Sequence, residues 1–201
     1  MTEHENRTDL MRQIRDEVIH LTESPLYKTR VKPVIGEGSH HARIVFVGEA
    51  PGKNEAQEGR PFCGSAGKVL DELLASAGIK RSDVYITNIV KDRPPENRDP
   101  YPEEIALYAP FLDRQLAVIK PEVIVTLGRF AMAYILEKFH AVNQPVMIGA
   151  AHGNIFKGSA LWGAVDIAVF YHPAVALYNG GMRPTLEKDF SVLARYAKPS
   201  L

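Results

Sequence analysis

Three side chains in separate parts of the chain have the chemistry needed to hold a planar heterocyclic ring. Phe62 lies in a long loop rich in glycine and proline, and its aromatic face can stack on another ring. Asn88 has a carboxamide with donors and an acceptor, so it can recognise the imide edge of a pyrimidine. His172 can donate a hydrogen bond to an anion that develops beside it. These three residues are candidates for one binding site.

Each of these side chains also has a purely structural interpretation. Phe62 can tuck into the core, Asn88 can cap the end of a strand, and His172 can simply be hydrogen-bonded. Residue types alone leave these alternatives open, so the place of each residue in the fold has to decide between them.

A local group of basic residues follows Asn88. Lys91, Arg93 and Arg98 can contact phosphates, and the alternative is that they belong to a solvated loop. The pair Gly67-Lys68 does not belong to a Walker-type phosphate loop, because the glycine and the hydroxyl residue that this motif requires are absent. The histidines other than His172 show no metal-ligand spacing.

Composition and charge narrow the classes of function. The chain has 201 residues, of which 45% are hydrophobic and 24% charged, which is enough for one globular domain over 1–201. Its 24 basic residues balance 24 acidic ones, which excludes a protein that coats nucleic acid by bulk charge. The one cysteine, Cys63, cannot form an internal disulfide, a four-cysteine zinc site or a cysteine-ligated iron–sulfur cluster. We expect a cytoplasmic protein without metal, cofactor or membrane segment.

The hydrophobic pattern predicts alternating strands and helices. Residues 7–21 have helical spacing, so an N-terminal helix within 1–24 is expected to pack on the domain. The segment 139–166 is less regular and is compatible with a hairpin around Gly153-Asn154. The remaining pattern predicts strands at 44–47, 84–90, 123–127 and 167–171, and helices at 66–77, 102–119, 128–138 and 185–197. This alternation predicts an α/β fold, a three-layer αβα sandwich with a central four-stranded parallel sheet.

A parallel sheet would bring the candidate residues together. Ligands of such sheets bind outside the carboxyl ends of the strands. Phe62, Asn88 and His172 all lie in segments that follow expected strands, so they are expected to meet in one crevice. The segments that would form it are 48–64, 88–101, 127–130 and 172–183.

Ordered motifs over residues 21–180 resemble the family 4 uracil-DNA glycosylases. Each motif is weak alone, but the set, in this order and at matching spacing, is specific. The matching segments are Gly48-Glu49-Ala50-Pro51-Gly52, 59–67, 85–88 with Lys91, Arg93-Pro94-Pro95, Asn97-Arg98, 102–105, 127–129 and His172-Pro173. The resemblance implies a monofunctional, monomeric enzyme that acts on uracil-containing DNA, single- or double-stranded, flips the uracil out and hydrolyses its N-glycosidic bond, with free uracil as product.

The resemblance also implies roles for residues that bind the base. Phe62 would stack on the uracil and Asn88 would hydrogen-bond its imide edge. His172 would donate to O2 of the departing uracil anion. Ala50 would line the same site, at a position where the best-studied glycosylase family has an aspartate.

The group that activates water is open, because two acids remain in the first motif. Glu49 would contact the uracil site and position water, and Glu55 is the second candidate for a catalytic carboxylate.

Contacts with DNA are implied for residues in several loops. Leu177 stands where the family places a residue that wedges into the space left by the flipped base, and Tyr178 stands where the family often has arginine. The alternatives are core packing for Leu177 and a solvated side chain for Arg129. The full set of expected DNA contacts is Gly64, Ser65, Gly67, Lys91, Arg93, Arg98, Arg129, Leu177 and Arg183.

The chain departs from the family at four cysteines that typically ligate a [4Fe–4S] cluster. The corresponding positions are Leu21, Ser24, Asp92 and Tyr108, and none of these side chains supplies a thiolate. We therefore expect no cluster. We expect packing around Leu21 and Tyr108 to hold the 91–101 loop against the N-terminal helix.

Two further functions are compatible with these motifs. One is a catalytically weak or inactive member that binds damaged DNA, and the other is a glycosylase that prefers hypoxanthine or xanthine. Asn88 and Phe62 favour uracil. A nucleotide-metabolising enzyme of the same fold class is disfavoured, because the Walker spacing is absent.

Overall fold

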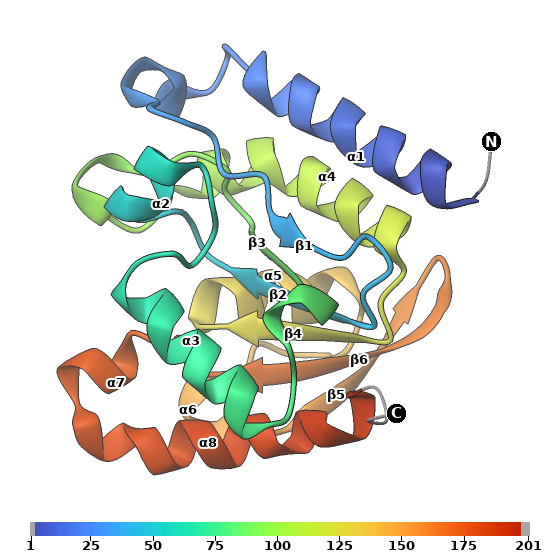
Figure 1. The fold of residues 1–201 in the computed structure, drawn as a ribbon, viewed down its shortest axis with the longest axis vertical. Coiled ribbons are helices and arrows are strands. Elements are labelled where there is room, and N and C mark those ends of the chain that lie inside the picture. The colour runs from blue at the N-terminus through green and yellow to red at the C-terminus, as the bar shows by residue number, and fades with distance from the viewer. Residues whose placement is uncertain (1–2, 198–201) are drawn as a thin grey trace.

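Continuous apolar runs form the centre of one sheet in the computed structural model, which describes residues 3–197 (Figure 1). The ends of the expected domain, 1–2 and 198–201, lie outside the described residues. Four parallel strands lie side by side in the order β3-β2-β4-β6. Their bounds are Ile44–Gly48 for β2, Tyr85–Asn88 for β3, Val123–Leu127 for β4 and Gly163–Phe170 for β6.

The expectation of a four-stranded, wholly parallel sheet is wrong, because a short antiparallel strand covers each edge. β1 (Glu37–Gly38) pairs with β3, and β5 (Ile155–Ala160) pairs with β6. The hairpin turns at residues 161–162 rather than at Gly153-Asn154, since Ala160 pairs with Gly163. These edge strands are half exposed, so they lack the apolar runs by which the inner strands are recognised.

Helices cover both faces of the sheet, which confirms the three layers. Val45 and Val47 of β2 point to one apolar cluster, and Ile44 and Phe46 point to another. The first cluster is closed by α1 (Glu3–Ile19), α4 (Pro102–Ile119) and α5 (Arg129–Lys138). The second is closed by α3 (Ser65–Ser76) and α8 (Arg183–Ser191). Figure 1 shows α1 beside α4 and α3 beside α8.

Short helical segments lie in the connections that the sequence pattern left irregular. The expected helix 185–197 divides into α8 and a 3-10 turn, Val192–Tyr196. The others are α2 (Lys53–Glu58), α6 (Ile148–Ala151), α7 (Val175–Tyr178) and the 3-10 turns Pro25–Thr29, Arg81–Asp83, Pro95–Asn97 and Gly180–Met182. Within residues 3–197, no helix has both the length and the apolar character required to cross a membrane.

Candidate active site

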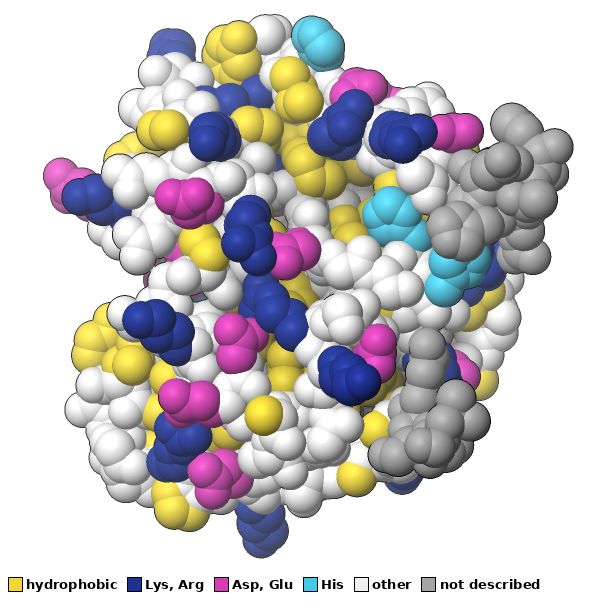
Figure 2. Space-filling model, in the orientation of Figure 1, with side chains coloured by type: hydrophobic (Ala, Val, Ile, Leu, Met, Phe, Trp, Pro, Cys, Tyr) yellow, Lys and Arg dark blue, Asp and Glu magenta, His cyan; other side chains and the backbone are white. Residues whose placement is uncertain are grey.

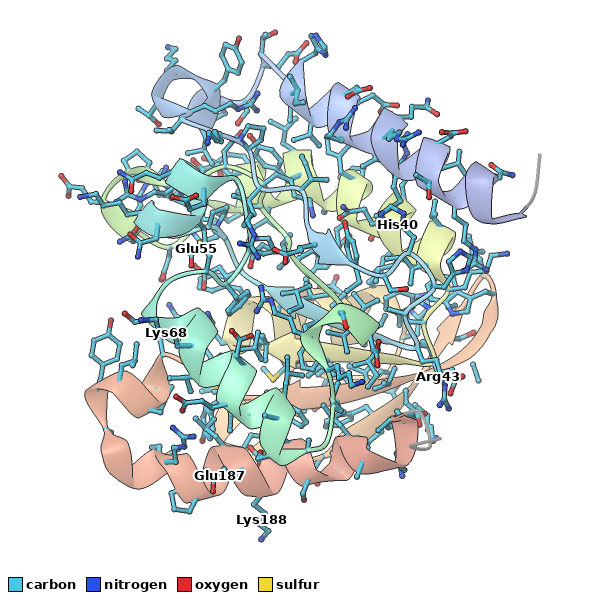
Figure 3. All side chains as sticks on the ribbon, viewed as in Figure 1. His40, Arg43, Glu55, Lys68, Glu187 and Lys188 are labelled. Atoms are coloured by element: carbon cyan, nitrogen blue, oxygen red, sulfur yellow. The ribbon has the colours of Figure 1, made fainter. Side chains whose placement is uncertain are left out.

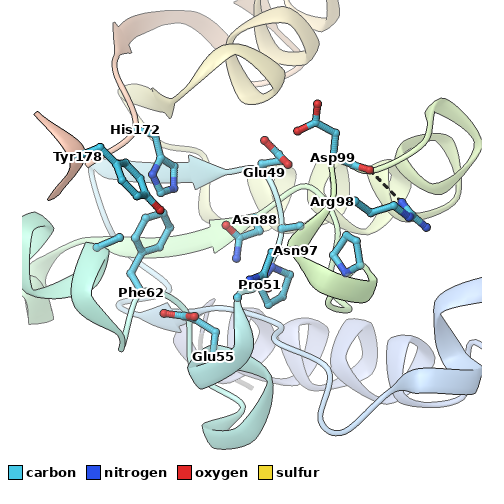
Figure 4. A pocket seen from close by; sticks show the side chains of 14 residues that line it. Glu49, Pro51, Glu55, Phe62, Asn88, Asn97, Arg98, Asp99, His172 and Tyr178 are labelled. Atoms are coloured by element: carbon cyan, nitrogen blue, oxygen red, sulfur yellow. Dashed lines mark hydrogen bonds between the residues drawn. The ribbon is translucent and has the colours of Figure 1, made fainter. Parts of the chain in front are cut away.

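A cavity opens at the carboxyl ends of β2 and β3, where the loops after both strands meet the segment after β6 (Figure 4). Its volume is about 520 Å³, which is within the range of small-molecule sites in proteins. Phe62, Asn88 and His172 all line it, so the fold brings together the three side chains with ring-binding chemistry. The complete lining is Glu49, Ala50, Pro51, Gly52, Glu55, Phe62, Ala66, Asn88, Pro94, Asn97, Arg98, Asp99, His172 and Tyr178.

Glycine at position 48 lets two of these side chains approach each other. A Cβ atom at Gly48 would lie 2.3 Å from Asn88 Oδ1 and 2.9 Å from Phe62 Cζ. Gly48 and Asn88 are direct partners in the register of β2 and β3, and Asn88 is only 2% exposed. The carboxamide and the phenyl ring therefore meet over a backbone position that has no room for a side chain.

The loop that carries Phe62 is held in a strained backbone conformation. Phe62 has a φ of 47°, in the left-handed region that costs free energy for a residue with a side chain. Glu55 from α2 accepts hydrogen bonds from the backbone N–H groups of Cys63 at 3.1 Å and Gly64 at 2.9 Å. A Cβ at Gly67 would lie 1.9 Å from the Phe62 carbonyl oxygen, so glycine is needed there too. Glu55 and Gly67 together fix the loop.

His172 packs against Phe62 inside the cavity. The two ring centroids are 5.5 Å apart, with 29° between the planes. Nδ1 of His172 accepts a hydrogen bond from the backbone N–H of Ala174 at 3.2 Å, so the proton of the neutral ring lies on Nε2. Burial lowers the pKa of His172 to about 4, although the charge of Glu55 opposes this shift. At neutral pH His172 is therefore an uncharged hydrogen-bond donor.

Glu49 brings a carboxyl group with an unusual proton affinity to the same cavity. Burial and, to a smaller extent, the negative charge of Asp99 raise the pKa of Glu49, Arg129 opposes both, and the net result is a pKa of about 7. Asp99 and Arg129 form an ion pair at 2.5 Å. A carboxylate with a pKa near neutrality is suited to accept a proton from water. Asp99 was not among the residues predicted for the site. The sequence feature that could have indicated it is its position directly after Arg98, in a loop that borders the cavity.

Comparison with known proteins identifies the family. A model of the uracil DNA glycosylase superfamily matches residues 35–194. The chain belongs to this superfamily. The type-4 uracil-DNA glycosylase of Sulfurisphaera tokodaii is 43% identical over 192 residues, which cover 94% of this chain and 86% of that protein. The type-4 enzymes of Archaeoglobus fulgidus and Thermotoga maritima are 45% and 42% identical, covering 87% and 86% of this chain and 86% of each relative.

Some residues that the family resemblance assigns to DNA lie at the surface of this superfamily member. Ser65 is exposed at the start of α3. Leu177 is 48% exposed, so it does not serve core packing, and Tyr178 beside it is 89% exposed. Arg129 pairs with Asp99, and the side chain of Arg183 reaches Glu72 at 2.5 Å and Glu187 at 3.0 Å.

The other arginines of the predicted DNA surface are also bound within the protein. Arg93 donates to Asn97 Oδ1 at 2.7 Å. Arg98 forms two hydrogen bonds with the buried carboxylate of Glu104 and lies 3.8 Å from the ring centroid of Tyr101. Figure 2 shows the same pattern over one face of the molecule, where basic and acidic side chains are interspersed. Among the residues that the structure describes, no large basic patch is visible on that face.

The expectation that Lys91 contacts DNA is wrong. Its side chain is fully buried, and its Nζ donates to Thr87 Oγ1 at 2.8 Å, to the Asn88 carbonyl at 2.7 Å and to Gln115 Oε1 at 2.7 Å. Burial lowers the pKa of Lys91 to about 7. From its buried position, Lys91 therefore holds the backbone carbonyl of Asn88 in place. Its sequence context, among other basic residues, gave no sign of this.

Two expected backbone contacts with DNA are corrected as well. The N–H of Gly64 is already used by Glu55, so it is not available to a phosphate. Gly67 is buried under the Phe62 carbonyl, which leaves it to accommodate the loop rather than DNA. Within the glycine-rich segment, Ser65 is exposed, as a contact with DNA requires.

The described residues do not fit a metal centre or an iron–sulfur cluster. Among residues 3–197, no three histidine, cysteine, aspartate or glutamate side chains gather in a way that could hold a metal ion. Cys63, the chain's one cysteine, lies in the Phe62 loop. Three of the four positions at which the family resemblance places cluster cysteines are Ser24, Asp92 and Tyr108, and the Tyr108 hydroxyl is hydrogen-bonded to both of the other side chains.

Proposed function

We propose that this chain removes uracil from DNA by hydrolysing its N-glycosidic bond, without an iron–sulfur cluster. Family membership and type-4 uracil-DNA glycosylase relatives at 42–45% identity support this proposal. The observation that carries it is the cavity at the carboxyl ends of the strands, where Phe62, Asn88 and His172 meet. A base stacked inside a duplex cannot reach such a cavity, so the enzyme flips it out.

Recognition of uracil rests on Asn88 and Phe62. The carboxamide of Asn88 accepts from N3–H of uracil and donates to O4, while the ring of Phe62 stacks on the base. Cytosine presents the opposite donor and acceptor at these two atoms, and a mispaired buried amide costs about 1–3 kcal/mol. Gly48 and Lys91 support this arrangement, because one lets Asn88 approach Phe62 and the other holds the Asn88 carbonyl.

His172 stabilises the leaving group. Cleavage of the glycosidic bond leaves a uracil anion and a positively charged sugar, and Nε2–H of His172 donates to O2 of that anion. The hydrogen bond from Ala174 to Nδ1 supports this tautomer, and the lowered pKa keeps the ring neutral. A neutral donor stabilises the anion without first transferring its proton.

Glu49 is the carboxylate that positions and activates water. Its raised pKa and its place on the cavity wall support this role, and its charge also balances the positive sugar. Glu55 is assigned a different role, since its carboxylate holds the Phe62 loop through two backbone amides. Glu55 therefore positions the stacking ring.

The DNA strand runs over the exposed residues around the cavity mouth. Ser65, Arg129, Arg183 and Leu177 remain the proposed contacts, with Leu177 entering the space left by the base and exposed Tyr178 beside it. Arg93 and Arg98 would contact a phosphate only while sharing their bonds to Asn97 and Glu104. Free uracil is the product, and action on single- or double-stranded DNA by a single-domain cytoplasmic monomer stays a prediction.

A uracil-excision assay in the presence of EDTA tests the proposal. The protein is incubated with labelled oligonucleotides that contain uracil, hypoxanthine or xanthine, and alkali then cleaves the strand at abasic sites. We expect cleavage of the uracil strand. A band shift on uracil DNA without alkali-labile sites would instead identify a binding protein, and preferential cleavage at hypoxanthine or xanthine would change the assigned substrate.

Substitutions in the cavity locate the activity. We expect Asn88→Ala and His172→Ala to slow uracil release by at least about tenfold, because each removes a hydrogen bond to the reacting base. His20→Ala, in an exposed histidine after α1, is the control. Wild-type rates for both cavity variants on single-stranded uracil DNA would exclude the assigned site.

A further inference from the structure

A buried polar network joins three parts of the chain behind the cavity. Nε of Arg30 donates to both carboxylate oxygens of Asp92, at 2.8 and 2.9 Å, and Nη2 donates to Oδ2 at 2.5 Å. The hydroxyl of Tyr108 donates to the same oxygen and lies 2.7 Å from Ser24 Oγ. The exposed fractions of the Arg30 and Asp92 side chains are 8% and 1%. Such a pair is withdrawn from solvent, so its partners depend on one another.

The network ties the loop after β3 to the N-terminal segment and to α4. Arg30 also donates to the carbonyl of Ile19 at the end of α1, at 2.7 Å. Ser24 Oγ accepts from the N–H of Leu26, which fixes the turn Pro25–Thr29. Asp92 thus receives bonds from segments that are 62 and 16 residues away in sequence.

An apolar cluster shares Tyr108 with this network and reaches the cavity. Val18, Leu26, Val90 and Tyr108 are its buried members. Leu21 and Ala50 are among the residues packed against it, and Ala50 also lines the cavity beside Glu49. The expected packing around Leu21 and Tyr108 is therefore present, and the hydroxyl of Tyr108 links it to the charged network.

The loop between Asp92 and Arg98 is pinned at both ends. Asp92 fixes its start through Arg30 and Tyr108. Arg98 fixes its end through the buried carboxylate of Glu104, whose Oε2 also accepts from the N–H of Tyr101. The segment between these anchors provides Pro94 and Asn97 to the cavity, and Asp99 follows directly. This wall of the cavity, residues 94–99, depends on the two anchors.

We infer that the network of Arg30, Asp92, Tyr108 and Ser24 is a positioning device that holds the cavity wall 94–99 in place for substrate binding. Three of its members, Ser24, Asp92 and Tyr108, occupy positions at which the family resemblance places cysteines of a cluster. In this chain, side chains alone connect the loop after β3 to the N-terminal segment and to α4 at these positions. The hydroxyl and carboxylate atoms of the network are already satisfied within the protein, as are all buried side-chain polar atoms among the described residues.

Asp92→Asn tests this inference, which rests on the proposed function for its kinetic part. The variant removes the charge that Arg30 needs but keeps the size of the side chain. We expect amide hydrogen exchange at Asn97 and Arg98, whose N–H groups donate to the carbonyls of Pro94 and Pro95, to become at least about tenfold faster. We also expect KM for a uracil oligonucleotide to rise about tenfold, because the wall is displaced. The rate constant kcat should change less than about threefold, because Phe62, Asn88 and His172 are held in place by contacts outside this network.

Two further variants keep the test decisive. Tyr108→Phe removes one hydroxyl and keeps the ring, so it should give the same changes to a smaller extent, and it decides the question if Asp92→Asn does not fold. Glu122→Gln disrupts the exposed pair with Arg43, two hydrogen bonds of 2.7 Å, and should change neither quantity. Folded variants whose loop amides exchange no faster than those of Glu122→Gln, or whose loss is confined to kcat, would overturn the inference. Absence of uracil excision in the unaltered protein would refute the proposed function while leaving the exchange measurement intact.

Discussion

At the scale of single residues, Glu49 makes the most specific prediction about pH. Its pKa is raised to about 7, mainly by burial and then by Asp99. A base works only when deprotonated, so the single-turnover rate of uracil release should rise as the pH increases through about 7 and level off above it. Glu49→Gln should be slower by at least about tenfold and lose this rise. Rates measured from pH 5 to 9 check this.

Asp99 should influence the midpoint of this pH dependence, which is the pH at which the rate of uracil release reaches half of its upper level. Asp99→Asn removes a negative charge near Glu49 and releases Arg129, whose positive charge favours the carboxylate, so the rise should move to lower pH. Asp9→Asn in the exposed pair with Arg12 is the matched control. A midpoint that stays in place in Asp99→Asn, or that moves equally in the control, would contradict this coupling.

Gly48 shows how a missing side chain shapes the cavity. We expect Gly48→Ala to slow uracil release by at least about tenfold, because the new Cβ would overlap Asn88 Oδ1 and the Phe62 ring. Gly149→Ala in α6 meets only Tyr171 Oη, at 3.7 Å, and should keep the unaltered rate and melting temperature. Equal rates in the two variants would mean that the contact between Asn88 and Phe62 is not needed.

At the scale of elements, the contact between α2 and the Phe62 loop allows two possible roles of Glu55 to be distinguished by experiment. If Glu55 holds the loop, Glu55→Gln should keep most of the activity, because its amide oxygen can still accept from Cys63 and Gly64, whereas Glu55→Ala should lose at least about tenfold. If Glu55 activates water, both variants should be equally impaired. Single-turnover rates at saturating enzyme distinguish these outcomes.

The inner elements of the fold could be predicted from sequence because burial on both faces leaves a continuous apolar run. Val45 and Phe46 illustrate this, since they face opposite clusters and both are fully buried. The edge strands could not be predicted in the same way. β1 has only two residues, and β5 alternates between half-buried and exposed positions. The sequence pattern did not reveal helix α2 in the loop after β2, because its six residues are too few to show helical periodicity.

The ring-binding residues were predictable because their chemistry is visible in their side chains, and the supporting residues were not. Lys91 has the same residue type as a phosphate contact, and only the fold reveals that it is buried under Asn88. Asp92 and Tyr108 are far apart in sequence and meet only in three dimensions, so no spacing signal links them.

At the scale of the whole molecule, the balance of charge should limit the affinity for DNA. The net charge is zero, and the side chains of Arg129 and Arg183, both proposed to contact DNA, are paired with carboxylates. Each phosphate contact releases counterions, so Arg183→Ala should reduce the slope of log affinity against log salt by about 1. Arg43→Ala should not change the slope, since Arg43 lies far from Glu55 on the other side of the molecule (Figure 3). Fluorescence anisotropy at several salt concentrations measures both.

The single thiol provides a natural attachment point for a reporter beside the ring stack. Cys63 follows Phe62 directly, and burial together with the charge of Glu55 raises the pKa of its thiol. Maleimide reagents should therefore react slowly and, because the sequence contains one cysteine, at a single atom. A fluorophore introduced there, without any mutation, would sense the arrival of an extruded base next to the phenyl ring and give the kinetics of eversion in real time.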